Sequence, residues 1–101
     1  MEKAFKALAS EPRRRILSYL LEAPMTVGEI GNHFEMALPS ISKHLAILKD
    51  AGFVREQKLG QFVLHSVDAE AMAGVLYGFL APFDAEAARI VDMRGIGKKR
   101  R

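Results

Sequence analysis

The chain of 101 residues contains no cysteine, which excludes disulfide bonds and thiolate metal ligands. Long hydrophobic runs are also absent, since the apolar stretches fall far short of the roughly 20 residues that a membrane-spanning helix requires. The N-terminal sequence MEKAFKALASEP lacks the apolar core and the cleavage site of a secretory signal peptide. These absences predict a cytoplasmic, single-domain protein that has no membrane partner.

The chain contains three histidines, and their placement argues against metal binding. His33, His44 and His65 fall on different predicted elements, and no two of them have the spacing of metal ligands. No phosphate-binding loop, Ser-His-Asp order or carboxylate pair stands out in the sequence. We therefore expect the protein to be neither an enzyme nor a carrier of a metal or cofactor.

Charge is unevenly distributed along the chain. Residues 1–62 carry nine basic and seven acidic side chains, residues 63–97 carry two basic and five acidic ones, and the last four residues are all basic. We expect a folded domain over residues 1–94 and a flexible basic tail over residues 95–101. The tail is either a solvated end or an additional attraction for phosphate, and the sequence leaves both interpretations open.

The first part of the chain predicts three helices. Residues 2–9 have helical periodicity, and Ser10 precedes Glu-Pro as an N-cap residue does, so a second helix is expected over residues 11–22. Residues 26–29, TVGE, match a capping box and begin a third helix of about two turns. The second helix is expected to bury one apolar face, formed by Ile16, Leu17, Leu20 and Leu21.

The sequence LPSISKHLAILKD, followed by Ala51 and Gly52, predicts a fourth helix with a glycine stop signal. Ile41, Leu45 and Leu48 recur at helical spacing and form the stripe that attaches this helix to its domain. The other face is then free, and its hydroxyls and lysine can bond base edges or phosphates. Polar residues on a helix face are also often only solvated, so neighbouring elements must decide between the two interpretations.

The rest of the chain predicts a β-hairpin followed by helical segments. Leu59-Gly60 is the expected hairpin turn, Asp68 is the expected N-cap of the next helix, and Pro82 is expected to kink or break that helix. The expected elements are strands over residues 53–58 and 61–67 and helical segments over residues 69–81 and 84–93. This order predicts a mainly α fold with a β-hairpin wing, a winged helix-turn-helix.

Three blocks of the sequence resemble successive segments of the ArsR-type transcriptional repressors. They are FKALASEPRRRILSYLLE, TVGEIGNHFEMALPSISKHLAILKDAGFV and REQKLGQFVLHSV, and the resemblance runs from about residue 3 to residue 80. The combination of Ser-Ile-Ser-Lys-His-Leu, Leu-Lys-Asp-Ala-Gly-Phe-Val and a Gly-Gln-Phe wing is specific. The resemblance implies a homodimeric repressor that binds double-stranded DNA at a palindromic operator.

The resemblance also implies a set of DNA-binding residues on the fourth helix and the wing. Many members of the family have a polar residue at the position of Leu38, so this apolar side chain leaves the operator sequence open. His44 lies beside the buried stripe, so packing is as plausible for it as base contact. The expected DNA-binding residues are Leu38, Pro39, Ser40, Ser42, Lys43, His44, Lys49, Lys58 and Gln61.

The metal-sensing members of the family use cysteine, or paired histidine and acidic residues, in two helices. The segment TVGEIGNHF has no cysteine, and residues 69–93 have no histidine. The resemblance is therefore to the branches that lack metal ligands. A small-molecule inducer could bind near the dimer seam, but no set of residues specifies one.

Residues 69–85 combine a wide apolar face with an opposite face of small residues that includes Gly74 and Gly78. A glycine in a helix costs about 1 kcal/mol relative to alanine, so two of them suggest that another helix approaches closely. The core can cover one face, and a second copy of the chain is expected to cover the other. The expected dimerisation residues are Phe5, Leu8, Met72, Val75, Leu76, Gly78, Phe79 and Phe83.

Two functions remain open from the sequence. One is a DNA-binding repressor, which the lysines of the fourth helix and wing favour. The other is a winged-helix module that docks on a protein through its apolar helix and does not bind DNA. The basic cluster at residues 13–15 is expected to form one structural ion pair and leave two arginines solvated, although one of them could reach a phosphate.

Overall fold

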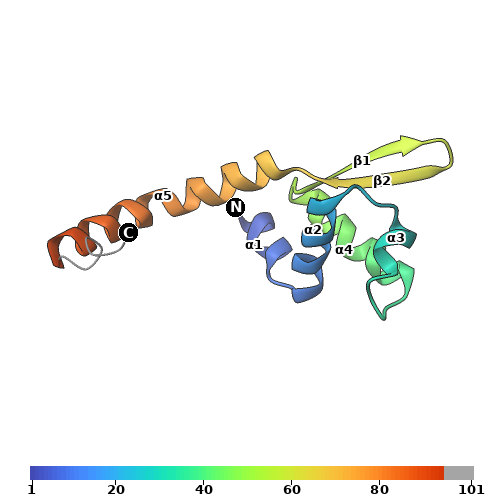
Figure 1. Ribbon diagram of the computed structural model, residues 1–101, viewed down its shortest axis with the longest axis horizontal. Helices are drawn as coiled ribbons and strands as arrows, with labels where there is room; N and C mark the ends of the chain where they lie inside the picture. The colour runs from blue at the N-terminus through green and yellow to red at the C-terminus, as the bar shows by residue number, and fades with distance from the viewer. Residues whose placement is uncertain (95–101) are drawn as a thin grey trace.

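The computed structural model describes residues 1–94, so the expected basic tail lies outside the described residues. Five helices and one antiparallel hairpin follow one another in the described chain (Figure 1), which confirms the mainly helical fold with a two-stranded wing. In chain order the elements are α1 (Glu2–Leu8), α2 (Glu11–Glu22), α3 (Val27–Gly31), α4 (Leu38–Asp50), β1 (Val54–Leu59), β2 (Phe62–Val67) and α5 (Ala69–Arg94).

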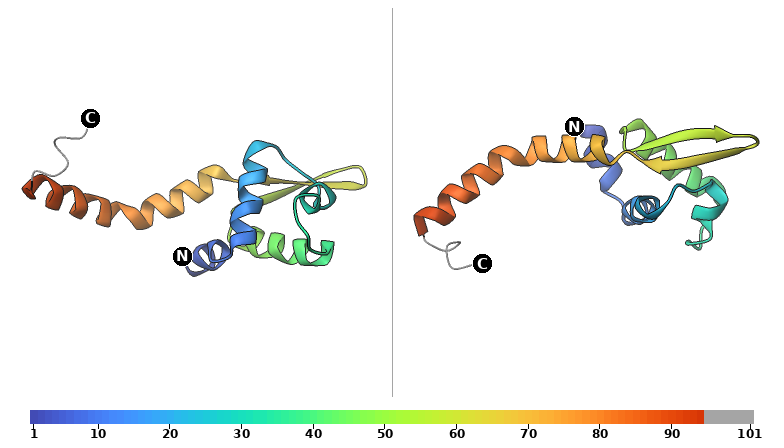
Figure 2. Two further views of the ribbon diagram at one scale, coloured as in Figure 1. Left: turned by 60° about the horizontal axis from the view of Figure 1, so that its bottom comes forward. Right: turned by 45° about the horizontal axis from the view of Figure 1, so that its top comes forward.

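Two elements project from a head that α1 to α4 build together. The hairpin leaves the head at one end and α5 leaves it at the other, as the views in Figure 2 show from two further directions. With 26 residues, α5 is about 39 Å long, and it accounts for much of the 58 Å length of the molecule. None of the described helices combines the length and the apolar composition that crossing a membrane requires.

The core joins the four helices of the head to the base of the hairpin. The predicted stripes of α2 and α4 are buried, with one correction: Leu21 is 69% exposed. It lies in the last turn of α2 and borders an open groove against α5. The buried apolar residues are Ala4, Ala7, Ile16, Leu17, Leu20, Ile30, Ile41, Leu45, Leu48, Phe53 and Val54.

Three helix starts are capped as the sequence predicts. The Ser10 hydroxyl accepts the backbone N–H of Arg13 at 3.4 Å, and the Asp68 carboxylate accepts that of Ala71 at 3.0 Å. Thr26 and Glu29 form the reciprocal capping box, at 3.2 Å and 2.9 Å. These local bonds satisfy backbone donors that would otherwise lack partners at the helix ends.

Gly52 provides the turn between α4 and β1, with a φ angle of +82°. Its N–H donates to the Lys49 carbonyl, and the next N–H, of Phe53, donates to the Leu48 carbonyl at 3.0 Å.

We expect Gly52→Ala to lower the free energy of unfolding by about 1–3 kcal/mol, because an L side chain is strained at this φ. Urea unfolding measures the loss. Ala51→Gly at the adjacent position, where φ is −79°, is the control for local flexibility. A Gly52→Ala protein as stable as the wild type would contradict this account.

The hairpin has a different turn from the predicted one. Leu59 pairs with Phe62, so the two turn residues are Gly60 and Gln61, one position later than expected. Gly60 has a φ of +63°, which suits the first central position of a two-residue turn. Met25, which follows α2, pairs with β2 near the base of the hairpin. Met25 and His65 exchange two backbone hydrogen bonds, of 3.0 Å and 2.7 Å.

The sequence predicts a kink or a break at Pro82, and the break is wrong, because α5 runs through Pro82 without interruption. Proline in a helix frees the carbonyl four residues earlier, here that of Gly78. Gly78 is exposed, so water can solvate that carbonyl, and the helix curves along its length (Figure 2). Asp84 and Glu86 therefore lie inside a helix and not at a helix start, and Glu86 is paired with Arg89.

Candidate nucleic-acid interface

A close approach between α3 and α4 forms the helix-turn-helix. Gly31 ends α3 where a side chain would meet the next helix: an added Cβ would lie 2.5 Å from a methyl carbon of Leu38. Ile30 and Ile41 are fully buried on either side of the turn. The six residues between the two helices therefore suffice to present the first turns of α4 at the surface.

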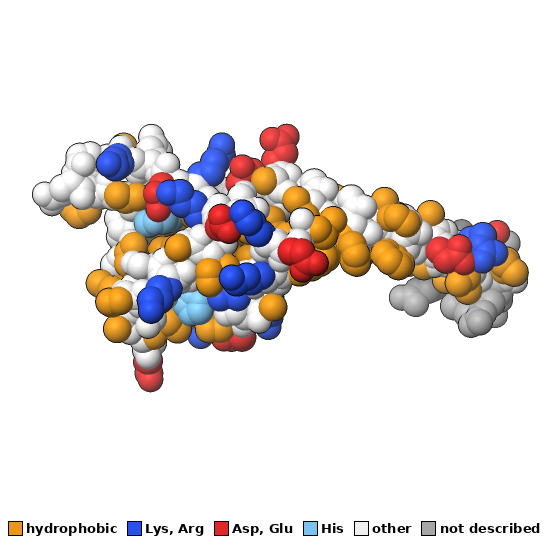
Figure 3. Space-filling model, turned by 180° about the vertical axis from the view of Figure 1, so that it is seen from behind, with side chains coloured by type: hydrophobic (Ala, Val, Ile, Leu, Met, Phe, Trp, Pro, Cys, Tyr) orange, Lys and Arg blue, Asp and Glu red, His pale blue; other side chains and the backbone are white. Residues whose placement is uncertain are grey.

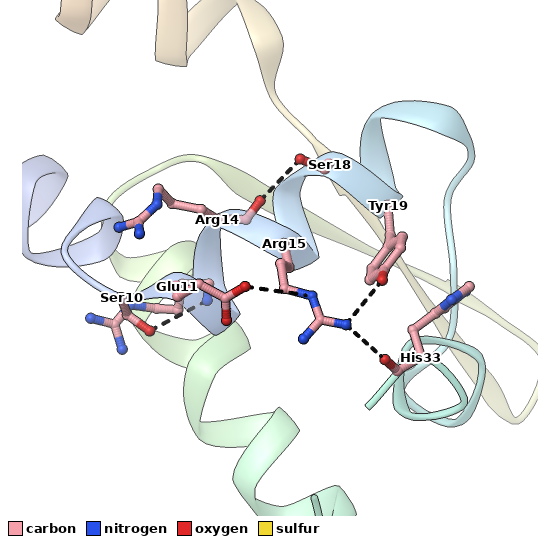
Figure 4. A network of polar contacts seen from close by, with 8 residues as sticks. Ser10, Glu11, Arg14, Arg15, Ser18, Tyr19 and His33 are labelled. Atoms are coloured by element: carbon pink, nitrogen blue, oxygen red, sulfur yellow. Dashed lines mark hydrogen bonds and ion pairs between the residues drawn. The ribbon is translucent and has the colours of Figure 1, made fainter. Parts of the chain in front are cut away.

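Arg15 attaches this turn to α2, as Figure 4 shows. Its guanidinium donates to the Tyr19 hydroxyl at 3.2 Å and to the His33 carbonyl at 3.1 Å, and it forms an ion pair with Glu11 at 3.8 Å. The Tyr19 ring stacks on the His33 imidazole with centroids 4.1 Å apart, and Arg15 lies 4.4 Å from the Phe34 ring centroid. One side chain thus holds the segment that leads into α4.

The other two arginines of the cluster are not free either, which corrects the expectation of two solvated side chains. Arg13 donates to the carbonyls of Lys6 and Ala7, and Arg14 donates to that of Leu8 at 2.6 Å. These carbonyls belong to the last turn of α1, where helix donors are missing, so both side chains stabilise the α1–α2 corner. No sequence signal short of tertiary contact indicated this.

The polar face of α4 is exposed in the arrangement that the sequence predicts. Ser40, Ser42 and Lys43 are exposed, and their side chains make no hydrogen bond or ion pair with any described residue. Leu38 is 49% exposed and Pro39 is also exposed, so an apolar patch precedes the hydroxyls. Hydroxyl and ammonium groups without protein partners can bond base edges or phosphate oxygens.

The backbone at the start of α4 contributes less to anion binding than a helix N-terminus normally does. Pro39 has no N–H, and the N–H groups of Ser40 and Ile41 both donate to the Ala37 carbonyl, at 2.9 Å and 3.2 Å. Ala37 also provides no side-chain cap. Any affinity of this helix end for a nucleic acid therefore rests mainly on side chains.

His44 is tied to the corner arginine. Arg13 lies 3.3 Å from Nδ1 of His44, and because arginine can only donate, Nδ1 accepts and a neutral ring carries its proton on Nε2. Partial burial, and then the charge of Arg13, lower the pKa of His44 below its usual 6.5. The neutral ring retains one N–H donor, so both expected roles, packing and polar contact, remain compatible with its position.

This lowered pKa predicts a pH dependence of stability. Because His44 binds its proton more weakly in the folded chain than in the unfolded one, its contribution to stability is present above pH of about 6.5 and is lost as pH falls. Urea unfolding between pH 5 and pH 8 should therefore show a steeper acid decline in the wild type than in His44→Gln. Parallel curves for the two proteins would contradict this expectation.

The wing carries the remaining expected contacts. Lys58 and Gln61 are exposed and make no hydrogen bond or ion pair with a described residue, as expected of groups that reach a ligand. Lys49 differs, because its ammonium donates to Glu56 of β1 at 2.9 Å. Figure 3 shows basic side chains interspersed with acidic ones over the head, so the field there is mixed.

The histidines do not come together in the structure. His33 stacks on Tyr19, His44 lies beside Arg13, and His65 is buried with its Nδ1 3.2 Å from the Met25 carbonyl. Within residues 1–94, no three histidine, cysteine or acidic side chains are grouped so as to hold a metal ion.

Four of the eight expected dimerisation residues lie on one apolar surface of α5 and α1. Met72 and Val75 are partly buried against the core, whereas Phe79 and Phe83 are 39% and 60% exposed. The rings of Phe79 and Phe5 meet edge to face with centroids 5.0 Å apart. Figure 3 shows hydrophobic side chains along the projecting helix. We call the surface of Phe5, Leu76, Phe79, Leu80 and Phe83 the apolar face.

Two further features adjoin this face. A groove of about 520 Å³ lies between α2 and α5, lined by residues that include Leu8, Leu17 and Leu76. On the other side of α5, a Cβ added at Gly74 or Gly78 would meet nothing within 4 Å. Among the described residues, no helix approaches these glycines closely.

The folded elements define a class of protein. Two helices joined by a tight turn, the second of which exposes the polar side chains of its first turns, and a hairpin beside it constitute a winged helix-turn-helix. Residues 10–56, which contain the turn and the whole of α4, match the bacterial regulatory proteins of the arsR family.

Comparison with known proteins assigns the family. The chain is 40% identical over 72 residues to the transcriptional repressor SdpR of Bacillus subtilis, covering 71% of this chain and 80% of that protein. The crystal structure of an ArsR family transcriptional regulator is similar with a TM-score of 0.75 at 32% identity, covering 85% of this chain and 94% of that one. The protein therefore belongs to the ArsR family of transcriptional regulators.

A third similarity concerns assembly. The homodimeric winged helix-turn-helix DNA-binding domain of a Mycobacterium bovis protein has a TM-score of 0.67 at 26% identity, covering 82% of this chain and 77% of that one. The resemblance found in the sequence is thus confirmed. So is the expectation that the protein is not an enzyme, since its family consists of transcriptional regulators.

Proposed function

We propose that the protein is a sequence-specific repressor that binds a palindromic operator as a homodimer and does not sense a metal. The observation that carries the proposal is the exposed polar face at the start of α4, which has no partner within residues 1–94 and is held outward by a buried stripe. The relative SdpR is named a transcriptional repressor, which supports the direction of regulation. Occupation of promoter DNA would then reduce transcription.

Side chains of α4 and side chains of the wing contact different parts of the DNA. Ser40, Ser42 and Lys43 enter the major groove with His44 beside them, and Leu38 and Pro39 contact thymine methyl groups. Lys58 and Gln61 extend from the wing to phosphate or the minor groove. The two copies of α4 in a dimer meet successive major grooves about 34 Å apart.

The dimer forms through the apolar face, with residues 1–94 making up the winged domain and its dimerisation helices. Large aromatic side chains that stay exposed on a projecting helix mark an interaction site in a protein of this size. The homodimeric relative from Mycobacterium bovis supports a second copy of the chain as the occupant. Leu8, Met72 and Val75 pack between this face and the core, and Gly78, on the other side of α5, offers a second surface where a partner helix could approach closely.

The residue types of the chain support the proposal that the protein does not sense a metal. Cysteine is absent, and the described residues offer no group of three ligands. Operator binding is therefore expected to be the same with EDTA and with added Zn²⁺. Release from DNA by Zn²⁺ at micromolar concentration would contradict this part of the proposal.

A gel shift on the promoter region of the protein's own gene tests the function, with random DNA of equal length as the control. Binding that is at least 10³-fold tighter on the promoter, and that weakens as salt rises, supports the proposal. Equal affinity for both DNAs, or no binding at low salt, overturns it. In vitro transcription from the same promoter should decrease when the protein is added, and an increase would contradict repression.

A further inference from the structure

His65, Glu56 and Lys49 connect the wing to α4, which is the recognition helix of the proposed DNA-binding function. His65 of β2 is 4% exposed and is bonded to Met25 through its backbone and its Nδ1 atom. Glu56 faces His65 directly across the hairpin, and its Oε2 lies 3.5 Å from the Nε2 of that ring. The other oxygen of Glu56 accepts from Lys49 of α4 at 2.9 Å.

These contacts lie at the point where the hairpin leaves α4. Among the described residues, the bond between Lys49 and Glu56 is the only hydrogen bond or ion pair that joins α4 to either strand. Beyond Glu56 the residues 57–62 are all exposed. The tip that carries Lys58 and Gln61 thus extends freely from a single polar link to the recognition helix.

We propose that Lys49, Glu56 and His65 form a strut that sets the angle of the wing relative to the recognition helix, so that Glu56 is a positioning residue for DNA binding. The inference rests on the proposed DNA-binding function. It also changes the role of Lys49, which serves the wing and not a phosphate.

Loss of the weak Lys49–Glu56 ion pair can displace the tip of the wing considerably, because the tip is distant from the pair. The tip lies four residues beyond Glu56, about 13 Å along the strand, so a rotation of about 10° at the strut displaces it by about 2 Å. A displacement of that size breaks a hydrogen bond to phosphate. An exposed ion pair contributes little to stability, so the strut can be broken without unfolding the chain.

The charge state of the strut agrees with this role. The hydrogen bond from Lys49 is the largest cause of a Glu56 pKa below its usual value, and the charge of Lys49 acts in the same direction. Glu56 therefore stays ionised at neutral pH. It also neutralises Lys49 locally, which makes a direct phosphate contact by that lysine weaker.

Charge reversal at Glu56 distinguishes an effect on the position of the wing from a general change in the attraction between protein and DNA. Glu56→Lys places two lysines together and opens the strut, while it raises the net charge and so strengthens attraction to any DNA. We expect the ratio of promoter to random-DNA affinity to fall about tenfold, equivalent to about 1.4 kcal/mol. The double variant Lys49→Glu with Glu56→Lys restores an attractive pair, and its ratio should return to within about threefold of the wild type.

Two controls complete the experiment. Glu22→Lys makes the same charge change on an exposed residue of α2 that has no partner among the described residues, and it should leave the ratio unchanged. Amide order parameters from NMR relaxation report on the wing without DNA. They should fall over residues 57–62 in Glu56→Lys and recover in the double variant, while the order of α4 stays constant.

The outcomes distinguish the two proposals. If the wild type does not discriminate its promoter from random DNA, the regulatory function fails, and the order parameters still decide whether the strut exists. If the wild type discriminates but Glu56→Lys keeps its ratio, or the double variant is no better than the single one, the strut is wrong. Unchanged order over residues 57–62 in Glu56→Lys overturns it independently of DNA.

Discussion

A protein carrying Phe79→Asp is expected to be a monomer and to lose operator affinity by about 10²- to 10⁴-fold. Phe79 lies in the middle of the apolar face, with Phe5 5.0 Å away on one side and Phe83 5.3 Å away on the other, measured between ring centroids. A second copy of the chain would bury the new carboxylate without a partner, which opposes association. Each monomer would then bind one half-site, and the gain from linking two half-sites would be lost.

Light scattering and a gel shift on the operator measure the two parts of this result. Ala23→Asp, at the exposed end of α2, adds the same charge away from the apolar face and should remain dimeric. Far-UV circular dichroism checks folding, which we expect to be retained because Phe79 is 39% exposed. A Phe79→Asp protein that is still a dimer would show that the interface lies elsewhere. A wild-type monomer would favour docking on another protein.

Replacing Lys43 with alanine is expected to weaken operator binding by about 5- to 150-fold, the range for one well-placed contact of about 1–3 kcal/mol. The Lys43 ammonium is exposed on α4 and makes no ion pair with any described residue, so its removal breaks no interaction within residues 1–94. A base contact would lower affinity more for the operator than for random DNA. A phosphate contact would lower both and reduce the slope against salt by about 0.9.

Lys3→Ala is the matched control for this variant. Lys3 lies on α1 and pairs with Asp50 at 3.3 Å, with both side chains more than 60% exposed, so the pair contributes little to stability. The variant removes the same charge as Lys43→Ala and should change operator affinity less than twofold. If both variants bind the operator as the wild type does, Lys43 is not part of the DNA-binding surface.

The helix starts and the recognition helix were predictable because their signals are local. A capping residue bonds a backbone N–H only two or three positions away, so Ser10, Thr26 and Asp68 identify their helices without knowledge of the fold. Helical spacing likewise placed Ile41, Leu45 and Leu48 on one face. The polar face of α4 follows from the same periodicity.

Pro82 and the hairpin turn show where local rules are insufficient. Proline always removes one helix hydrogen bond and crowds the preceding turn, but the cost is smaller where water reaches the freed carbonyl, and the exposure of Gly78 is a property of the whole fold. The turn moved by one residue because pairing of Leu59 with Phe62 places Gly60 where a positive φ is required. The preference of a dipeptide cannot by itself determine the register of two strands.

By itself, the sequence determined the class of this protein: its helices, its wing, its family and the outward face of α4. Only the tertiary structure decided which charged side chains remain available to a ligand. Arg13 meets His44 across 31 positions, and His65 meets Met25 across 40, so no periodicity or local motif links these partners. Lys43 and Lys49 lie on one helix, and packing left the first exposed while it brought the second against Glu56. The reason is physical: helices and their caps depend on bonds between near neighbours, whereas contacts such as Arg13–His44 depend on which distant segments the core brings together.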